Sequence, residues 1–232
     1  MPAHIDQEKL KASPEVEGAR ERTVEDVVLS RHSVRRFQDR SVAEDTLLKL
    51  FSLAQRAPSD WNLQPWRWLV LSQLAEKERL QGVVPGDSLV LRAPVAVIAL
   101  ANTKEWEHAS EHLREYVESG RYSEEEFTEK VRQITEAFHG QPEKAREFAV
   151  KNTMLALMTL ALVAQGEGLG TGFIGDFDEA GIRSQFEIPE DLAIAAVTTI
   201  GYPSEDPPKS LRKPLGEVVH WQRMGCKRGA PN

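Results

Sequence analysis

The order of apolar segments predicts an α+β sandwich, with helices packed on a sheet. Three short runs rich in Trp, Val and Ile have the composition of buried strands: WRWLVLS at 66–72, APVAVIALAN at 93–102 and LAIAAVTTIGYP at 192–203. Most of the remaining chain has helical periodicity. The 232 residues are enough to bury a core without disulfides.

Two helices are expected before the first strand. Thr23 followed by Asp26 predicts a capped helix that ends near Arg31. Ser41, with Glu44 three residues on, predicts a second capped helix that ends before position 58. A polar helical stretch is expected between the first two strands.

The second half of the chain begins with an unusual charged segment. Residues 104–147 carry twelve acidic and seven basic residues, which predicts an exposed helical excursion. A long helix over about 143–165 should run through the core and end at the glycine cluster GEGLGTG. FIGDF predicts a strand, and a short helix follows near 178–186. We expect a polar arm over 1–22 and one domain over 23–232.

Charge and cysteine content exclude several function classes. The net charge is −7, so the chain lacks the basic excess of a protein that coats nucleic acid. The single Cys226 cannot form an internal disulfide or a tetrahedral metal site. The first twenty residues have no signal-peptide core, and the most apolar run, 154–164, is about half a membrane span. We therefore expect a cytoplasmic protein that binds neither nucleic acid nor membrane.

A basic segment contrasts with this acidic chain. The segment RHSVRRF at 31–37 begins a stretch, residues 31–40, with a local charge of +3. In an extended conformation Arg31, Ser33 and Arg35 point the same way. Two guanidinium groups and a hydroxyl suit a phosphate dianion. The alternative is a solvated basic turn at the end of a helix.

A second candidate is the loop APSDWNLQPWRW at 57–68. Asn62 and Gln64 have the donors and acceptors to bind a planar heterocycle, and neighbouring tryptophans could form apolar walls. The alternative is a connection whose tryptophans pack the core, which we prefer for Trp66 and Trp68.

The remaining motifs give little evidence for a function. GTGFIG at 170–175 has the glycine spacing of a dinucleotide fingerprint, but a helix precedes it and no helix follows at once, so we reject a Rossmann site. His108 and His112 lie four apart without the HExxH order, and we expect no metal. No GxSxG elbow is present, which leaves covalent hydrolysis unsupported.

Taken in order, RHSVRRF, APSDWNLQPWRWLVL, GLGTGFIG, GYP and RKPLGEVVHW resemble the FMN-dependent nitroreductases over about residues 24–221. The resemblance implies a mixed, mainly antiparallel sheet and an intertwined homodimer with FMN sites at the subunit interface. It implies that the phosphate contacts come from Arg31, His32, Ser33, Arg35, Lys209 and Arg212. It further implies flavin contacts from Pro58, Ser59, Asn62 and Gln64 of the partner chain, and from the backbone of Ile174 and Gly175.

The same resemblance implies a ping-pong oxidoreductase, in which NADH or NADPH reduces FMN and a nitroaromatic, quinone or similar acceptor reoxidises it. No catalytic side chain and no metal are expected. Alternatives are a protein that sequesters or degrades reduced flavin, a flavin enzyme acting on activated alkenes or halogenated aromatics, and an interaction protein using the acidic segment. We expect that segment near the pocket mouth, where its charge would disfavour anionic acceptors.

Overall fold

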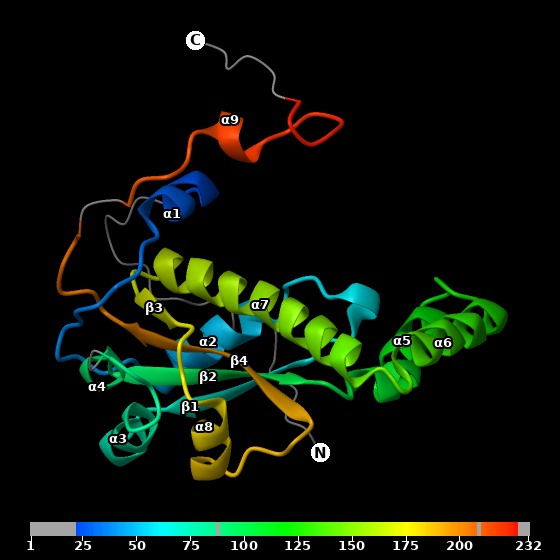
Figure 1. Ribbon diagram of the computed structural model, residues 1–232, viewed down its shortest axis with the longest axis horizontal. Helices are drawn as coiled ribbons and strands as arrows, with labels where there is room; N and C mark the ends of the chain where they lie inside the picture. The colour runs from blue at the N-terminus through cyan, green and yellow to red at the C-terminus, as the bar shows by residue number, and fades with distance from the viewer. Residues whose placement is uncertain (1–21, 87–88, 208–209, 227–232) are drawn as a thin grey trace.

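The computed structural model describes residues 22–86, 89–207 and 210–226, so the predicted arm over 1–22 lies almost wholly outside the described residues. A four-stranded antiparallel sheet with order β1-β2-β4-β3 forms the centre of the fold (Figure 1). Its strands are β1 (Trp66–Leu71), β2 (Val95–Asn102), β3 (Gly170–Ile174) and β4 (Leu192–Gly201). The expected parallel component is confined to one bridge, between Ser33 and Thr171.

The helices follow the predicted order. Among the described residues they are α1 (Val24–Ser30), α2 (Glu44–Ala54), α3 (Leu74–Gln81), α4 (Leu89–Arg92), α5 (Ala109–Glu118), α6 (Glu124–Phe138), α7 (Pro142–Gly166), α8 (Glu179–Gln185) and α9 (Leu215–Val218), with short 3-10 turns η2 (Asp60–Asn62) and η3 (Glu105–His108). Thr23 and Asp26 form the predicted capping box of α1.

The predicted cap of α2 is wrong. The helix begins at Glu44, and Ala43 is an N-cap residue without a side-chain hydrogen bond. Val42 is buried in the core instead, which holds the chain before the helix extended. The acidic Glu44 and Asp45 in the first turn favour the helix start through its dipole.

Strand alternation sends side chains into two cores, one on each face of the sheet. Helices α2 and α7 cover the face that carries Val95, Val97 and Ala99. Helices α3, α4 and α8 cover the face that carries Ala96 and Ile98. Figure 1 shows these two layers above and below the sheet. The α+β sandwich predicted from the sequence is confirmed.

Helix α7 differs from the expected core helix in one respect. Leu157, Leu160 and Ala164 are buried against the sheet, but Leu155 and Met158 are 48% and 40% exposed. By length and composition α7 would pass as a membrane span, although its buried face is that of a core helix. An exposed apolar stripe therefore remains along the outer side of α7.

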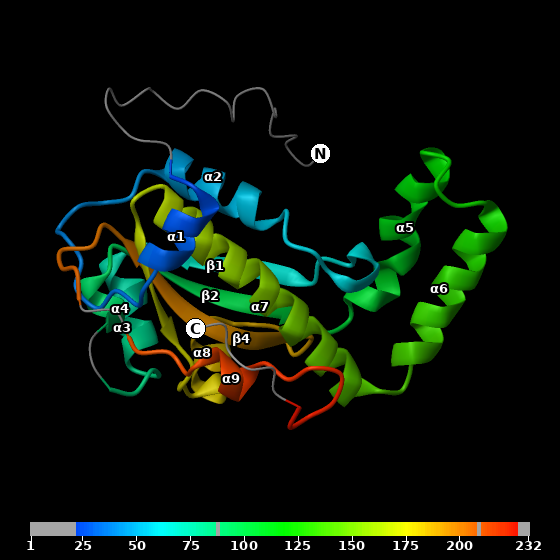
Figure 2. The ribbon, with the colours of Figure 1, turned by 90° about the horizontal axis from the view of Figure 1, so that it is seen from above.

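The acidic excursion is a hairpin of α5 and α6 that projects from one end of the sheet (Figure 2). It is less exposed than its composition predicts, because it has a small core of its own. Leu113, Ile134 and Phe138 are buried there, together with Leu63 from the loop before β1. The hairpin thus packs on the second candidate segment.

Candidate functional site

The basic segment lies extended beside β3. The Val34 N–H donates to the Thr171 carbonyl at 2.9 Å, and the Val34 side chain is fully buried. Because side chains alternate in an extended chain, Ser33 and Arg35 point away from this buried position and line one cavity. The structure therefore brings two of the predicted phosphate ligands together.

The glycines of GTGFIG allow this close approach. A Cβ atom on Gly172 would lie 2.7 Å from the Val34 carbonyl oxygen and 2.9 Å from Thr199 Oγ1. A Cβ atom on Gly170 would overlap the Val34 side chain. The glycines serve strand-to-chain packing rather than a strand-to-helix turn, and α7 precedes β3. The rejection of a Rossmann site is confirmed.

These segments enclose what we call the basic cavity, of about 220 Å³. Its walls combine Ser33–Arg35 with the end of β3, including Ile174 and Gly175. A Cβ atom on Gly175 would meet no atom within 4 Å, so its backbone faces open space. A third wall, which no sequence motif indicated, comes from Val84 and Pro85 after α3 and from Leu89 and Arg92 of α4.

Arg31, His32 and Arg212 are not among the residues that line this cavity. Arg31 is the C-cap residue of α1. His32 Nδ1 is 2.9 Å from the Ser30 carbonyl, whereas its Nε2 is buried and has no hydrogen-bond partner in the described structure. Arg212 lies on the C-terminal arm, exposed. Lys209 lies outside the described residues.

The loop from Ser59 to Gln64 has a strained backbone. Trp61, Asn62 and Gln64 have φ values of 52°, 56° and 50°, in the left-handed region that non-glycine residues rarely adopt. Ser59 Oγ accepts from the Gln64 N–H at 3.0 Å, which uses the Ser59 hydroxyl within the loop. Such strain is often found at functional sites, where surrounding contacts maintain it.

The strained loop lines a second cavity, the polar cavity, of about 650 Å³. Pro58, Asn62 and Gln64 lie on one side of it, and Tyr116, Ser119 and Arg121 of the hairpin on the other. Arg56 and Glu115 add one charge of each sign. Segment 104–147 thus borders this cavity, as expected for a pocket mouth, but Glu115 is the one acidic residue in the described lining, and the acidic first turn of α6 lines a different hollow.

The polar and basic cavities have no lining residue in common. The hairpin and α4 lie at opposite ends of the sheet in both views (Figures 1 and 2). Within one chain, then, Ser33 and Arg35 lie beside Ile174 and Gly175, whereas Pro58, Asn62 and Gln64, the residues expected from the partner chain, line the other cavity.

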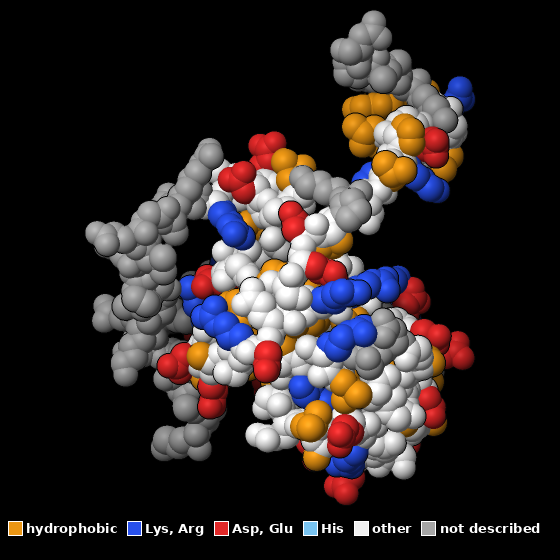
Figure 3. All heavy atoms as spheres, turned by 90° about the vertical axis from the view of Figure 1, so that its left-hand side faces the viewer, with side chains coloured by type: hydrophobic (Ala, Val, Ile, Leu, Met, Phe, Trp, Pro, Cys, Tyr) orange, Lys and Arg blue, Asp and Glu red, His pale blue; other side chains and the backbone are white. Residues whose placement is uncertain are grey.

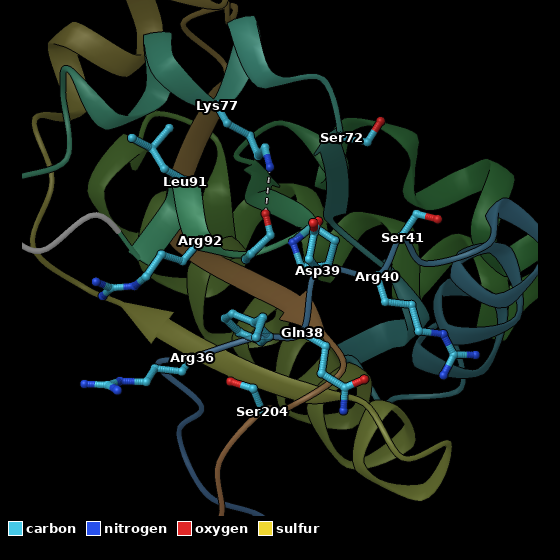
Figure 4. Close-up of a pocket in the computed structure, with 13 residues that line it drawn as sticks. Arg36, Gln38, Asp39, Arg40, Ser41, Ser72, Lys77, Leu91, Arg92 and Ser204 are labelled. Atoms are coloured by element: carbon cyan, nitrogen blue, oxygen red, sulfur yellow. Dashed lines mark hydrogen bonds between the residues drawn. The ribbon is translucent and has the colours of Figure 1, made fainter.

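A third cavity adjoins the basic cavity through Arg92, which lines both. Figure 3 shows Lys and Arg side chains gathered on this side of the molecule. The cations of this third cavity have partners within the fold. Arg36 pairs with Glu205 at 3.5 Å, and the Arg40 guanidinium stacks 3.7 Å from the Tyr202 ring centroid. Lys77 donates to the Ala93 carbonyl at 2.7 Å (Figure 4), and burial lowers its pKa. These contacts stabilise the fold.

The histidine pair forms no metal site. His108 lies 3.5 Å from Glu111, and His112 contacts the buried Glu105 on another element. Within residues 22–86, 89–207 and 210–226 no group of three potential ligands is present.

Comparisons with known proteins agree with the arrangement. A model of the Nitroreductase family matches residues 28–202. An NADH dehydrogenase of Thermus thermophilus is 35% identical over 195 residues, 84% of this chain and 93% of that protein. A Bacillus subtilis protein described as an NAD(P)H nitroreductase, YodC, is 29% identical over 84% of this chain and 97% of its own length.

The fold itself matches solved structures. A protein from Exiguobacterium sibiricum, described as a nitroreductase and solved in complex with FMN, has a TM-score of 0.79 at 21% identity. That match covers 87% of this chain and 98% of the other.

Proposed function

Because the chain belongs to the nitroreductase family, we propose that it is an FMN-dependent oxidoreductase. It uses NADH or NADPH to reduce a small oxidised acceptor, of the nitroaromatic, quinone or activated-alkene class. The observation that carries the proposal is the basic cavity, where Ser33 and Arg35 lie beside the open backbone of Gly175.

The residues present fit FMN. Ser33, Arg35 and Arg92 provide a hydroxyl and two guanidinium groups for a phosphate. The open backbone at Gly175 admits a flat ring close to the chain. The FMN-bound structure with the same fold supports this assignment.

When bound, the flavin supplies the hydride and electron chemistry. The chain's own residues hold and enclose it. Arg35 and Ser33 would hold the phosphate end, and the open backbone at Gly175 would leave room for the ring. The lining of the basic cavity also holds one carboxylate, Asp176, to which this proposal gives no acid–base role, because its protein groups bind and orient the reactants. One pocket that serves donor and acceptor in turn gives ping-pong kinetics.

A second copy of the chain would complete the site. At about 220 Å³ the basic cavity is smaller than the roughly 300–1,000 Å³ usual for ligand pockets. In a symmetric dimer, Pro58, Asn62 and Gln64 of the partner chain would provide the missing wall. Two exposed apolar surfaces suit such an interface. They are Leu48, Leu53, Met154, Leu155 and Met158 on α2 and α7, and Leu211, Leu215, Val218, Trp221 and Met224 on the arm that leaves the body in Figure 1.

Steady-state kinetics test this function against its alternatives. Purified chain loaded with FMN should oxidise NAD(P)H only when an acceptor is present, with parallel double-reciprocal lines. Total flavin, measured before and after many turnovers, should be unchanged. Consumption of flavin without turnover of the acceptor would instead identify a protein that degrades or sequesters flavin. A variant that lacks residues 104–147 tests the interaction alternative. If it keeps its turnover but no longer binds a protein partner, the hairpin has a separate interaction role.

A further inference from the structure

A buried carboxylate lies where three elements meet beside the polar cavity. Glu105 is only 4% exposed, and both of its oxygens accept hydrogen bonds. Oε2 accepts from the Arg67 guanidinium of β1 and from the Asn102 amide of β2, each at 2.7 Å. Oε1 lies 2.9 Å from His112 Nε2 of α5. One side chain thus joins the sheet to the hairpin.

The donors around Glu105 keep it charged. Burial raises the pKa of this carboxyl group, but the hydrogen bond from His112, the charge of Arg67 and the hydrogen bond from Asn102 outweigh it, so the pKa is lowered. A buried charge with satisfied partners is costly to disturb, because the loss of either side leaves an unpaired polar group.

Arg67 extends this cluster to the strained loop. While one of its terminal nitrogens binds Glu105, the other donates to the Gln64 carbonyl at 3.3 Å and to the Trp66 carbonyl at 2.9 Å. Gln64 is the last of the three residues with positive φ. The Glu105 carboxylate therefore fixes the guanidinium that binds the end of the loop.

The hairpin holds the middle of the same loop by apolar contacts. Leu63 is fully buried in the hairpin core. The Trp61 ring lies 5.9 Å from the ring of Phe138 on α6 and 5.9 Å from the ring of Phe148 on α7. At the start of the loop, the Asp60 N–H donates to Asn152 of α7 at 3.0 Å. The unfavourable backbone angles are maintained by contacts that surround the loop, and the hairpin supplies many of them.

We propose that Glu105 is a positioning residue, which acts through Arg67 to hold Asn62 and Gln64 in the shape that the flavin of the partner chain requires. This role rests on the proposed function. It also gives the hairpin a purpose: α5 and α6 brace the Ser59–Gln64 loop. Through that loop they set the geometry of the second half of the site.

Three variants of the FMN-loaded protein test the proposal. Glu105→Gln keeps the size of the side chain and removes its charge. Arg67→Lys keeps a cation near Glu105 but lacks the second terminal nitrogen that reaches Gln64. The matched control is Glu129→Gln, which removes a carboxylate from α6 of the hairpin. That carboxylate also lies 2.7 Å from an arginine but is exposed.

Amide hydrogen exchange of residues 59–64 is the first readout. We expect exchange in this loop to be at least tenfold faster in Glu105→Gln and Arg67→Lys, and to be unchanged in Glu129→Gln. Exchange in β2 and β4 should not change in any variant, which separates loop release from general destabilisation. Hydrogen exchange can be measured without bound flavin. It therefore tests whether Glu105 holds the loop even if the chain binds no FMN and the proposed function is wrong.

The visible circular dichroism of bound FMN and the acceptor kinetics are the second readout. Both loop-releasing variants should alter the dichroism and lower kcat/KM for the acceptor about tenfold, while the control resembles the unmodified protein. Wild-type exchange, dichroism and kcat/KM in Arg67→Lys would overturn the proposal. If Glu105→Gln fails to fold, the comparison of Arg67→Lys with the control Glu129→Gln is enough to test the proposal.

Discussion

Replacement of Gly172 by alanine tests how the basic segment is held against β3. The added Cβ atom would lie 2.7 Å from the backbone oxygen of Val34 and 2.9 Å from Thr199 Oγ1. Neither neighbour is the free end of a flexible side chain. The segment that carries Ser33 and Arg35 must therefore move away from the strand.

Two effects contribute to the loss in free energy of unfolding expected for Gly172→Ala. Insertion of a methyl group into a packed site costs about 1–3 kcal/mol. Displacement of Val34 weakens its hydrogen bond to Thr171, 2.9 Å long, at about 0.5–1.5 kcal/mol. Together they lower the free energy of unfolding by roughly 2–4 kcal/mol, a drop in Tm of roughly 4–16 °C for a chain of this length.

Thermal unfolding of the apo-protein measures this effect, and FMN titration measures the movement of the cavity wall. Gly175→Ala is the matched control for stability, because its Cβ atom would meet nothing within 4 Å. We expect its Tm to be unchanged or slightly higher, since alanine restricts the unfolded chain. Equal Tm values for Gly172→Ala and Gly175→Ala would refute the close-approach argument.

Four further outcomes follow. Arg35→Ala should raise the Kd for FMN about 10- to 150-fold, because it removes a charged hydrogen bond worth about 1.5–3 kcal/mol. Equilibrium titration with FMN checks this. The control is Arg36→Ala, since the Arg36 side chain pairs with Glu205 instead. Leu155→Glu places a charge on the exposed stripe of α7 and should convert a dimer to a monomer in light scattering, with loss of FMN; a variant that remains dimeric contradicts the interface. Arg121→Gln should lower kcat/KM for nitrobenzoate about two- to fivefold at low salt without affecting nitrobenzene, because the polar cavity has two arginines and one glutamate; equal effects on both acceptors count against it. In the folded chain the pKa of Glu105 is lowered from its ordinary value of 4.5. The charged carboxylate therefore stabilises the fold above pH 4.5, and this stabilisation is lost as the pH falls through the folded pKa. Acid titration should show a steeper loss of stability in the unmodified protein than in Glu105→Gln.

Much of the fold could be predicted because local patterns and tertiary packing agree. The apolar runs that became β2 and β4 are buried on both faces, so their composition alone indicated strands. The run that became β1 lies at the edge of the sheet and is partly exposed, but its Trp, Leu and Val residues still indicated a strand. The start of α2 was missed because burial of Val42 overrides the capping signal at Ser41. The packing of the hairpin on Leu63 was also missed, since a surplus of charge hides a narrow apolar face.

The site was only partly predictable for a physical reason. Ser33, Arg35 and Gly175 belong to recognisable motifs, and the fold brings them together. Arg92 and Glu105 belong to no motif, because their importance arises from neighbours far along the chain. The strain at Trp61, Asn62 and Gln64 likewise leaves no mark in the sequence, since it depends on contacts from α6 and α7.

Anaerobic titration of the FMN-loaded protein with NADH or NADPH tests the central claim most directly. About one equivalent of nucleotide per flavin should bleach the visible absorbance. Addition of a nitroaromatic or quinone after removal of the oxidised nucleotide should then restore it. A chain that takes up no FMN in its basic cavity, or whose flavin is not reduced by either nucleotide, would contradict the account.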